Sequence, residues 1–352
     1  MGISPGFRDR LSGMTCAKRV LTEPADTWVY GYDNSRKHVP PDVVVFATSH
    51  REVQDIVRLC HEHGVPIVAR GRGTATTGAA IPVRGGVVLS LERMNRILNV
   101  DPANRVIVVE PGVTNQAVQE AVAAHGFFWP PDPTSAAYCT VGGNLAVNAA
   151  GPHAVKYGST RENTLGLRAV TGAGDDIHTG VYTTKGVVGY DLTRLLIGSE
   201  GTLAVITEAT LKLTPLPEAR RLMQAVYTNV GQAAAAISRI MAQPATPCAL
   251  EFMDAAAIEM IRGYAQADLP HGAGALLMIE VDGPTSALDD LAAAIRTAAT
   301  DNGLIRFHEA RTKEESDALW ATRKALSPAL RTIAPNKLNE DVVVPVSRIP
   351  AA

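Results

Sequence analysis

This 352-residue sequence has few cysteines, no long apolar runs and no large excess of charge of either sign. The four cysteines stand far apart, at Cys16, Cys60, Cys139 and Cys248. Because no two of them form a C-x-x-C pair, the sequence predicts neither an iron–sulfur site nor a disulfide scaffold, and a reducing compartment fits it best. No stretch approaches the roughly 18 apolar residues of a transmembrane helix, and the N-terminus lacks the apolar core of a signal peptide. We therefore expect a cytoplasmic protein that reaches the inner membrane, if at all, only through a partner.

The charges of the chain nearly cancel. A formal net charge of -2 and a pI near 6.5 leave no broad basic face, which argues against nucleic acid and polybasic membrane binding. The length exceeds the usual size of a single core, and a 46% hydrophobic content can fill two. We expect an N-terminal arm over residues 1–39 and two domains over residues 40–215 and 216–352.

Residues 65–82, VPIVARGRGTATTGAAIP, have the composition of an anion-binding loop. A short apolar strand leads into glycines that let the backbone approach a ligand closely, and successive N–H groups with threonine hydroxyls can hold a phosphate or pyrophosphate. An ordinary glycine turn between two strands is the alternative interpretation. The residues that we predict to form the cradle are Arg70, Gly71, Arg72, Gly73, Thr74, Thr76, Thr77 and Gly78.

The loop does not match the dinucleotide fingerprint G-x-G-x-x-G. Thr76 stands where the third glycine should be, and residues 79–84 contain a proline and no helical periodicity. The sequence therefore predicts a phosphate-binding loop that differs from the G-x-G-x-x-G loop.

A second region poor in large side chains follows at residues 130–151. It contains PPDPTS, CTVGGN and NAAG, a density of small residues that lets the main chain lie against a large planar ligand. Two such regions in one domain favour a large bound cofactor.

The order of the expected elements indicates an α+β fold. Strands are predicted at residues 42–46, 67–69, 87–91, 106–110, 204–207 and 210–213, and a capping box of Ser49 and Glu52 begins a helix that Gly64 ends. Thr114 caps a second helix, which ends at Gly126. Small mixed sheets are favoured over a doubly wound sheet because no long parallel series of strands occurs.

Four segments in this order resemble the PCMH-type FAD-binding domain of the vanillyl-alcohol oxidase superfamily: RGRGTATTG, PDPTS with CTVGGN, NAAG followed by Lys156-Tyr157-Gly158, and GYDLTRLLIGSEGTLAVIT. Within it the chain looks most like the glycolate oxidase flavoprotein subunit and the FAD-linked D-lactate and D-2-hydroxyglutarate dehydrogenases. The resemblance covers about residues 40–213 and continues more weakly to the C-terminus. It implies a two-subdomain FAD-binding domain followed by an incomplete ferredoxin-like α+β cap.

The resemblance also implies which residues bind FAD. Thr74 stands where relatives with covalent flavin carry histidine, so noncovalent FAD is expected. Arg72 departs from the family, which usually has Gly or Ala there. Beyond the cradle, the expected FAD-binding residues are Pro111, Asp132, Pro133, Ser135, Thr140, Gly142, Gly143, Asn144, Gly151, Tyr157, Gly158, Glu200, Gly201 and Ile206.

The region after Pro215 is expected to form the cap. Its strands are predicted at residues 223–227, 249–253, 276–281 and 304–308, and its helices at residues 233–241, 255–264, 286–299 and 313–330. In the D-2-hydroxyacid members, an arginine on the last helix and a lysine before the final strand bind the substrate carboxylate, and Arg323 and Lys337 match them. A solvated helix cation is the alternative interpretation of Arg323.

The resemblance implies a small 2-hydroxy acid as substrate and an electron acceptor or partner subunit of unknown identity. The family's general base and metal-binding segment, H-x-G-D-G-N-x-H, would lie beyond Ala352, so a divalent metal is expected only there, and the chain looks truncated. His153 and His308 are weak alternative candidates for the base. A noncatalytic FAD-binding subunit and another superfamily branch, such as an aryl-alcohol oxidase or an ether-lipid synthase, remain open.

Overall fold

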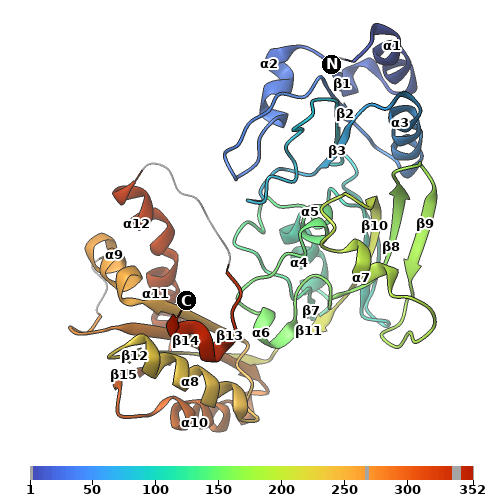
Figure 1. Cartoon of the computed structure of the whole chain (residues 1–352). Helices are drawn as coiled ribbons and strands as arrows, with labels where there is room; N and C mark the ends of the chain where they lie inside the picture. The colour runs from blue at the N-terminus through green and yellow to red at the C-terminus, as the bar shows by residue number, and fades with distance from the viewer. Residues whose placement is uncertain (1–2, 266–268, 335–341, 352) are drawn as a thin grey trace. The chain divides into compact units, whose positions relative to one another are not determined.

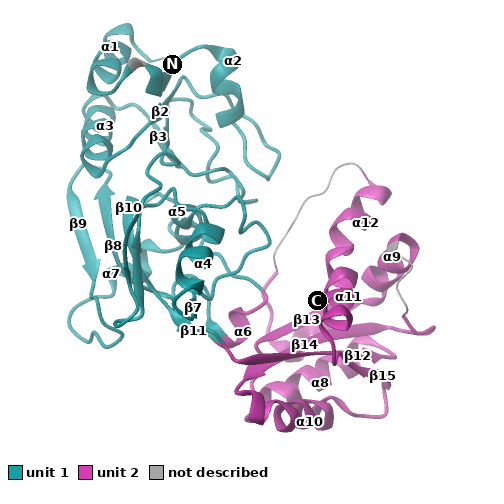
Figure 2. Cartoon of the chain, turned by 180° about the vertical axis from the view of Figure 1, so that it is seen from behind, with its two compact units in different colours: residues 1–151, 157–216 teal, residues 152–156, 217–352 magenta. Residues whose placement is uncertain are grey.

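The computed structural model describes residues 3–265, 269–334 and 342–351 and divides into two compact units (Figure 1, Figure 2). The first unit comprises Met1–Gly151 and Tyr157–Leu216, and the second comprises Pro152–Lys156 and Pro217–Ala352. Lys337 lies outside the described residues.

The first unit begins with a small sheet of four short strands. Its order is β1-β2-β4-β3, with β2 and β3 parallel to β4 and β1 antiparallel to β2. The bounds are β1 Val20–Leu21, β2 Val43–Phe46, β3 Ile67–Arg70 and β4 Val87–Ser90. All four residues of β2 are buried, as expected for a β-branched run that is apolar on both faces.

Helix α3 (His50–His63) connects β2 to β3 and begins and ends where the sequence predicts. Ser49 accepts a hydrogen bond from Glu52 N (3.3 Å), and Gly64 ends the helix with φ 62°. The reciprocal half of the predicted capping box is absent among the described contacts, since the Glu52 carboxylate binds Thr48 N and Arg19 instead. The other N-terminal elements are α1 Pro5–Met14, η1 Ala17–Arg19, α2 Pro24–Thr27 and η2 Trp28–Tyr30.

A second, antiparallel sheet completes the first unit, in the order β5-β6-β10-β8-β9. The strands are β5 Ile97–Asp101, β6 Val106–Val109, β8 Thr164–Thr171, β9 Asp176–Gly180 and β10 Ala204–Lys212. Its core includes the fully buried Trp129. The other elements of this part are the helices α4 Asn115–Ala123, α5 Val141–Ala146 and α7 Leu192–Leu196 and the short strand pair β7 Phe127–Phe128 and β11 Thr214–Pro215.

One prediction in this part was wrong in detail, and one segment forms a helix that was not predicted. The strands expected at 204–207 and 210–213 are one strand, β10, whose pairing with β8 is interrupted by register shifts rather than by a turn. The C-T-V-G-G-N stretch is largely helical: Thr140 caps α5 by accepting from Gly143 N, which overrides the poor helix propensity of two glycines.

The second unit is built on a four-stranded antiparallel sheet. The strand order β13-β14-β12-β15 is that of a ferredoxin-like sheet, as predicted. The strands are β12 Ala219–Tyr227, β13 Ala249–Asp254, β14 Ala275–Gly283 and β15 Leu304–Glu309. Apolar residues of α8 and α10 pack on one face of the sheet and those of α9 and α11 on the other.

The helices of this unit are α6 Ala154–Tyr157, which ends in the first unit, α8 Val230–Ala242, α9 Ala255–Ala265, η3 Thr285–Ala287, α10 Leu288–Ala299, α11 Lys313–Lys324, α12 Leu326–Ile333 and η4 Val346–Ala351. The single helix predicted over residues 313–330 is therefore two helices. Pro328 explains the break, because a proline has no N–H for the carbonyl of Lys324 and its ring would clash with it.

Candidate functional site

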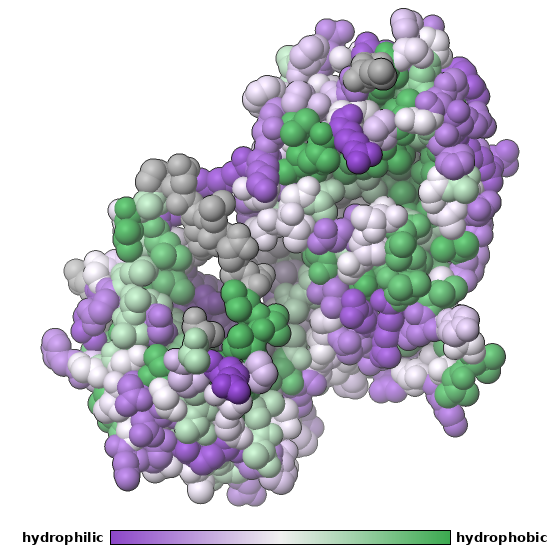
Figure 3. All heavy atoms as spheres, in the orientation of Figure 1, coloured by the Kyte–Doolittle hydropathy of each residue, from purple (hydrophilic) through white to green (hydrophobic). Residues whose placement is uncertain are grey.

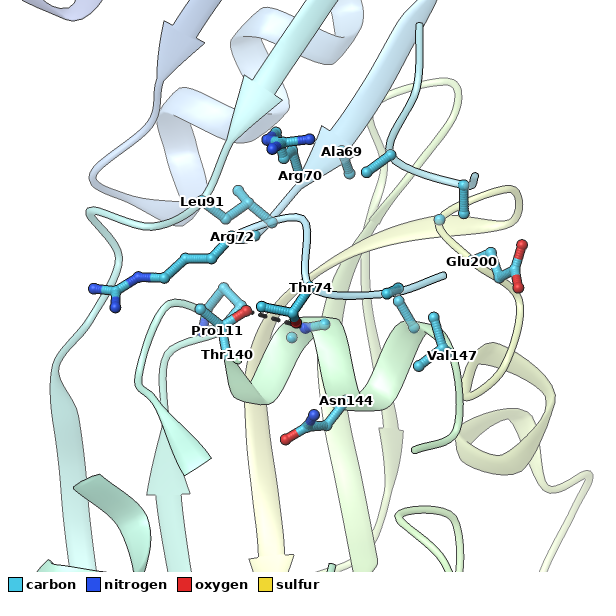
Figure 4. Close-up of a pocket in the computed structure, with 18 of the residues that line it drawn as sticks. Ala69, Arg70, Arg72, Thr74, Leu91, Pro111, Thr140, Asn144, Val147 and Glu200 are labelled. Atoms are coloured by element: carbon cyan, nitrogen blue, oxygen red, sulfur yellow. Dashed lines mark hydrogen bonds between the residues drawn. The ribbon is translucent and has the colours of Figure 1, made fainter. Parts of the chain in front are cut away.

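One pocket of the first unit is lined by both glycine-rich regions (Figure 4). About 990 Å³ of space, part of it open solvent, lies between its lining residues. Small residues supply much of its wall, and Leu91, Pro111, Val147 and Ile206 supply larger apolar surface. The pocket can therefore accommodate an extended, partly apolar ligand.

The Arg70 side chain connects the cradle loop to the N-terminal arm. Its guanidinium donates to the carbonyl of Tyr32 (2.7 Å), and the residue is only 6% exposed. Burial lowers the pKa of Arg70, although nearby acidic groups, Asp33 first, oppose this effect. Gly73 lies against this guanidinium: its φ is +63°, and a Cβ there would be 2.4 Å from an Arg70 nitrogen.

The N-terminal arm holds the far end of the same loop. Buried Asp33 accepts from Gly78 N (2.9 Å), and Asn34 N donates to the carbonyl of Ala75 (3.0 Å). The Gly78 N–H is therefore already used within the protein. The sequence analysis missed this role of Asp33, and a lone acidic residue in an irregular arm gave no periodic signal for it.

The second glycine-rich region approaches the cradle without large side chains between the two. A Cβ on Gly71 would be 2.4 Å from Thr140 Oγ1, and one on Gly142 would be 2.6 Å from Pro111 Cβ. Gly142 N also donates to the carbonyl of Pro111 (2.8 Å). Gly71 therefore permits the close approach of the cradle to Thr140, and Gly142 permits the close approach of α5 to Pro111.

Main-chain donors in the cradle are available to a ligand. Within the described part of the chain, the N–H groups of Gly73, Thr74 and Ala75 have no protein acceptor, and all three residues line the pocket. Three successive N–H groups of this kind can bind an anion such as a pyrophosphate. The pocket, its free donors and its small-residue walls fit a flavin nucleotide.

The structure divides the predicted FAD-binding residues into two groups. Those that line the pocket are Arg70, Gly71, Arg72, Gly73, Thr74, Pro111, Pro133, Ser135, Thr140, Gly142, Gly143, Asn144, Glu200, Gly201 and Ile206. Those outside its lining are Thr76, Thr77, Gly78, Asp132, Gly151, Tyr157 and Gly158. For every residue of both groups, contact with FAD stays a prediction.

Several predicted residues have a clear structural role. Asn144 is buried, and its side-chain oxygen accepts from Asn115 Nδ2 (3.2 Å). Gly151 packs on Asp132, whose Oδ1 would be 2.0 Å from an added Cβ. Tyr157 contacts Phe128 edge to face. These residues shape the main chain near the pocket.

The candidate substrate residue Arg323 lies in the second unit. Its Nε donates to the Glu251 carboxylate (2.7 Å), and 37% of its side chain is exposed. The structure therefore does not decide between a solvated helix cation and a residue that binds the substrate carboxylate. Arg323 has an ion-pair partner, and its side chain is still accessible. His308 is exposed on β15, and His153 is close to Glu280.

Comparison with known families gives two matches along the chain. Residues 41–180 match the family of the FAD binding domain, and residues 216–352 match the C-terminal domain of FAD linked oxidases. Among curated proteins, the chain is 40% identical over 322 residues to the glycolate oxidase subunit GlcD of Bacillus subtilis (strain 168). That alignment covers 91% of this chain and 68% of the relative. The chain belongs to the family of FAD-linked oxidases.

Other relatives agree with this membership. The glycolate oxidase subunit GlcD of Escherichia coli (strain K12) is 36% identical over 310 residues, which are 88% of this chain and 62% of the relative. The D-lactate dehydrogenase of Anaerostipes hadrus is 35% identical over 316 residues, 88% of this chain and 66% of the relative. This FAD-linked oxidase thus spans about two thirds of the length of the curated relatives it matches.

Solved structures share the fold. An alkyldihydroxyacetonephosphate synthase has a TM-score of 0.75 at 23% identity, covering 94% of this chain and 69% of its own. A p-cresol methylhydroxylase has a TM-score of 0.76 at 18% identity, covering 92% of this chain and 72% of its own. At these identities the likeness concerns the fold alone.

Hydrophilic and hydrophobic residues are interspersed on each unit over the face drawn in Figure 3. Among the described residues, every helix is too short or too polar to cross a bilayer.

We predict that Gly143→Leu will weaken FAD binding at least about tenfold, or about 1.4 kcal/mol. A Cβ at Gly143 meets only Thr140 Oγ1, at 3.3 Å, so the larger side chain would occupy the pocket. FAD affinity would be measured by fluorescence titration of the flavin-free protein. Gly172→Leu is the control, because Gly172 is exposed with open space around its Cβ position. Equal FAD affinities of the two variants would contradict the assignment of the pocket.

Proposed function

We propose that this FAD-linked oxidase takes part in the oxidation of a small D-2-hydroxy acid, of the glycolate or D-lactate type, to the 2-keto acid. The observation that carries the proposal is one pocket lined by residues of all four segments that resemble FAD-linked hydroxyacid oxidases. The names of the relatives support it, since they include glycolate oxidase subunits, a D-lactate dehydrogenase and a D-2-hydroxyglutarate dehydrogenase.

Oxidation of a 2-hydroxy acid removes a hydride from C2 and a proton from the hydroxyl group. FAD, when bound, would supply the hydride acceptor, and a general base would take the proton. The protein's part is to bind the nucleotide and to orient the acid. The N–H groups of Gly73, Thr74 and Ala75 would bind the pyrophosphate of FAD. The glycines of the lining would let other parts of FAD lie directly against the main chain. An electron acceptor or partner subunit completes the reaction.

Arg323 is the proposed ligand of the substrate carboxylate. A guanidinium has five N–H donors, and the ion pair with Glu251 uses the one on Nε. The remaining donors suit a second carboxylate in a bidentate arrangement, which would fix the acid for transfer of its C2 hydrogen. Lys337 is proposed to assist it.

The second candidate is a noncatalytic FAD-binding subunit of a larger dehydrogenase. Two observations favour it: the GlcD relatives are named as subunits, and the alignments leave about a third of each relative unmatched. In that case the chain would hold FAD without turning over a hydroxy acid on its own.

Anaerobic mixing with substrate tests the proposal directly. We expect glycolate or D-lactate to bleach the flavin absorbance of the purified protein, since reduction of the flavin accompanies hydride transfer. L-lactate is the control for stereochemistry. Bleaching by a phenol and by none of the hydroxy acids would favour an aryl-alcohol oxidase, and retained FAD with no bleaching at all would favour the noncatalytic subunit.

The attachment of FAD gives a second expected outcome. Thr74 has no nucleophilic imidazole to form a bond with the flavin, so we propose noncovalent binding. Acid precipitation should leave the yellow colour in the supernatant. Flavin retained on the washed pellet would show a covalent bond and overturn this proposal.

Arg323→Ala should raise the substrate KM at least about tenfold, because a hydrogen bond to a charged group contributes about 1.5–3 kcal/mol. The flavin absorption spectrum should stay unchanged. Steady-state kinetics would measure both KM and kcat. Lys324→Ala is a matched control, since it removes the adjacent exposed cation of α11.

Glu251→Gln separates substrate binding from a structural role of the ion pair. If Arg323 acts only through its bond to Glu251, the two variants should have the same effect on kinetics and stability. A KM increase confined to Arg323→Ala supports the carboxylate role, and matching effects of the two variants contradict it.

A further inference from the structure

A group of polar side chains is buried on one face of the sheet of the second unit. Along β14, Leu276, Met278, Glu280 and Asp282 share a face, because side chains alternate along a strand. Leu276 and Met278 pack in the core with residues of α9 and α11. Glu280 and Asp282 continue this row, with 6% and 3% exposure, and Trp320 of α11 donates to Glu280 Oε2 (3.3 Å).

Two further potential metal ligands, His153 and Cys248, lie next to the Glu280 carboxylate. His153 Nε2 is 3.3 Å from Glu280 Oε1, and Cys248 Sγ is 3.4 Å from the same oxygen. The three ligand atoms all lie within 4.8 Å of one another. They come from distant parts of the sequence: the segment Pro152–Lys156, the residue before β13 and the interior of β14.

These separations suit a tetrahedral ion. Zinc bonds of about 2.0–2.3 Å to nitrogen, oxygen and sulfur place neighbouring ligand atoms roughly 3.3–3.6 Å apart. Both measured distances to Glu280 Oε1 lie in that range, so an ion could enter with small movements of the three side chains. An imidazole, a thiol and a carboxylate together suit zinc better than magnesium or calcium, which prefer oxygen ligands alone.

We propose that His153, Cys248 and Glu280 bind a zinc ion in the second unit, with water as the fourth ligand. The ion would tie the segment Pro152–Lys156 to the sheet. A bond from Lys156 to the Asp282 carboxylate already joins the same two parts. Trp320 would hold the outer oxygen of Glu280, as groups behind metal ligands commonly do.

The charges around the cluster are consistent with this role. Burial opposes ionisation of Glu280, but the bond from His153 and the charge of Arg220 outweigh it and lower the pKa of Glu280. Burial, with the charges of Glu280 and Asp282, raises the pKa of Cys248, so the thiol stays protonated without a cation. A divalent ion favours the thiolate and replaces the thiol proton. Arg220, 3.7 Å from Glu280 and 39% exposed at its side chain, can move away from the incoming ion.

Cobalt substitution gives the sharpest test, because only a site with a thiolate ligand shows sulfur-to-cobalt charge-transfer absorption. The full chain, stripped of metal with a chelator, would be titrated with Co²⁺ and then with Zn²⁺. We expect one equivalent of Co²⁺ to produce the charge-transfer band and Zn²⁺ to abolish it. Zn²⁺ should also raise the melting temperature of the protein, because it binds the folded state.

Variants identify the ligands. Cys248→Ser should remove the cobalt band and weaken Zn²⁺ binding at least about tenfold, and His153→Gln should weaken Zn²⁺ binding to a similar degree. Cys16→Ser is the matched control, because Cys16 is an exposed free thiol. His178→Gln is the control for adventitious binding, because its side chain is 69% exposed.

Two results would overturn the proposal. One is a folded wild-type protein that binds no stoichiometric Co²⁺ or Zn²⁺, which would leave the three residues as a hydrogen-bonded group. The other is a cobalt band that persists in Cys248→Ser or disappears in Cys16→Ser. If Cys248→Ser does not fold, the titration of His153→Gln decides. None of these readouts depends on FAD or on a hydroxy acid.

Discussion

The pocket of the first unit depends on close packing against two glycines. Gly71 lies against Thr140, and Gly142 lies against Pro111, with no room for a Cβ at either glycine. The first contact joins the loop after β3 to the start of α5, and the second joins α5 to the segment after β6. All four residues line the pocket. A methyl group at Gly71 would require Thr140 to move, and one at Gly142 would require Pro111 or α5 to move.

Two buried charged side chains also support the cradle. The guanidinium of Arg70 and the carboxylate of Asp33 connect the loop to the N-terminal arm, and both groups are buried. Among the described residues, the main-chain N–H groups of Gly73, Thr74 and Ala75 have no protein acceptor and remain for a ligand. Arg70 and Asp33 thus hold the loop in place through hydrogen bonds within the protein.

The second unit uses its sheet differently. One face carries the apolar core under α8 and α10, while the other face changes along β14 from apolar residues to Glu280 and Asp282. Buried carboxylates are costly unless they are paired, and here His153, Arg220, Lys156 and Trp320 surround them. The same arrangement that neutralises these charges gathers the ligands of the proposed zinc site.

The sequence by itself determined the elements with strong local signals. Buried β2, α3 with its cap and final glycine, and the strand order of the second unit's sheet follow from short-range patterns or from the resemblance. Tertiary structure decided what local pattern could not. Thr140 makes a helix of C-T-V-G-G-N, Asp33 removes Gly78 from the available donors, and folding gathers His153, Cys248 and Glu280 across more than a hundred positions. Contacts between distant residues leave no periodic trace in a sequence, because they arise only when separate segments pack against each other.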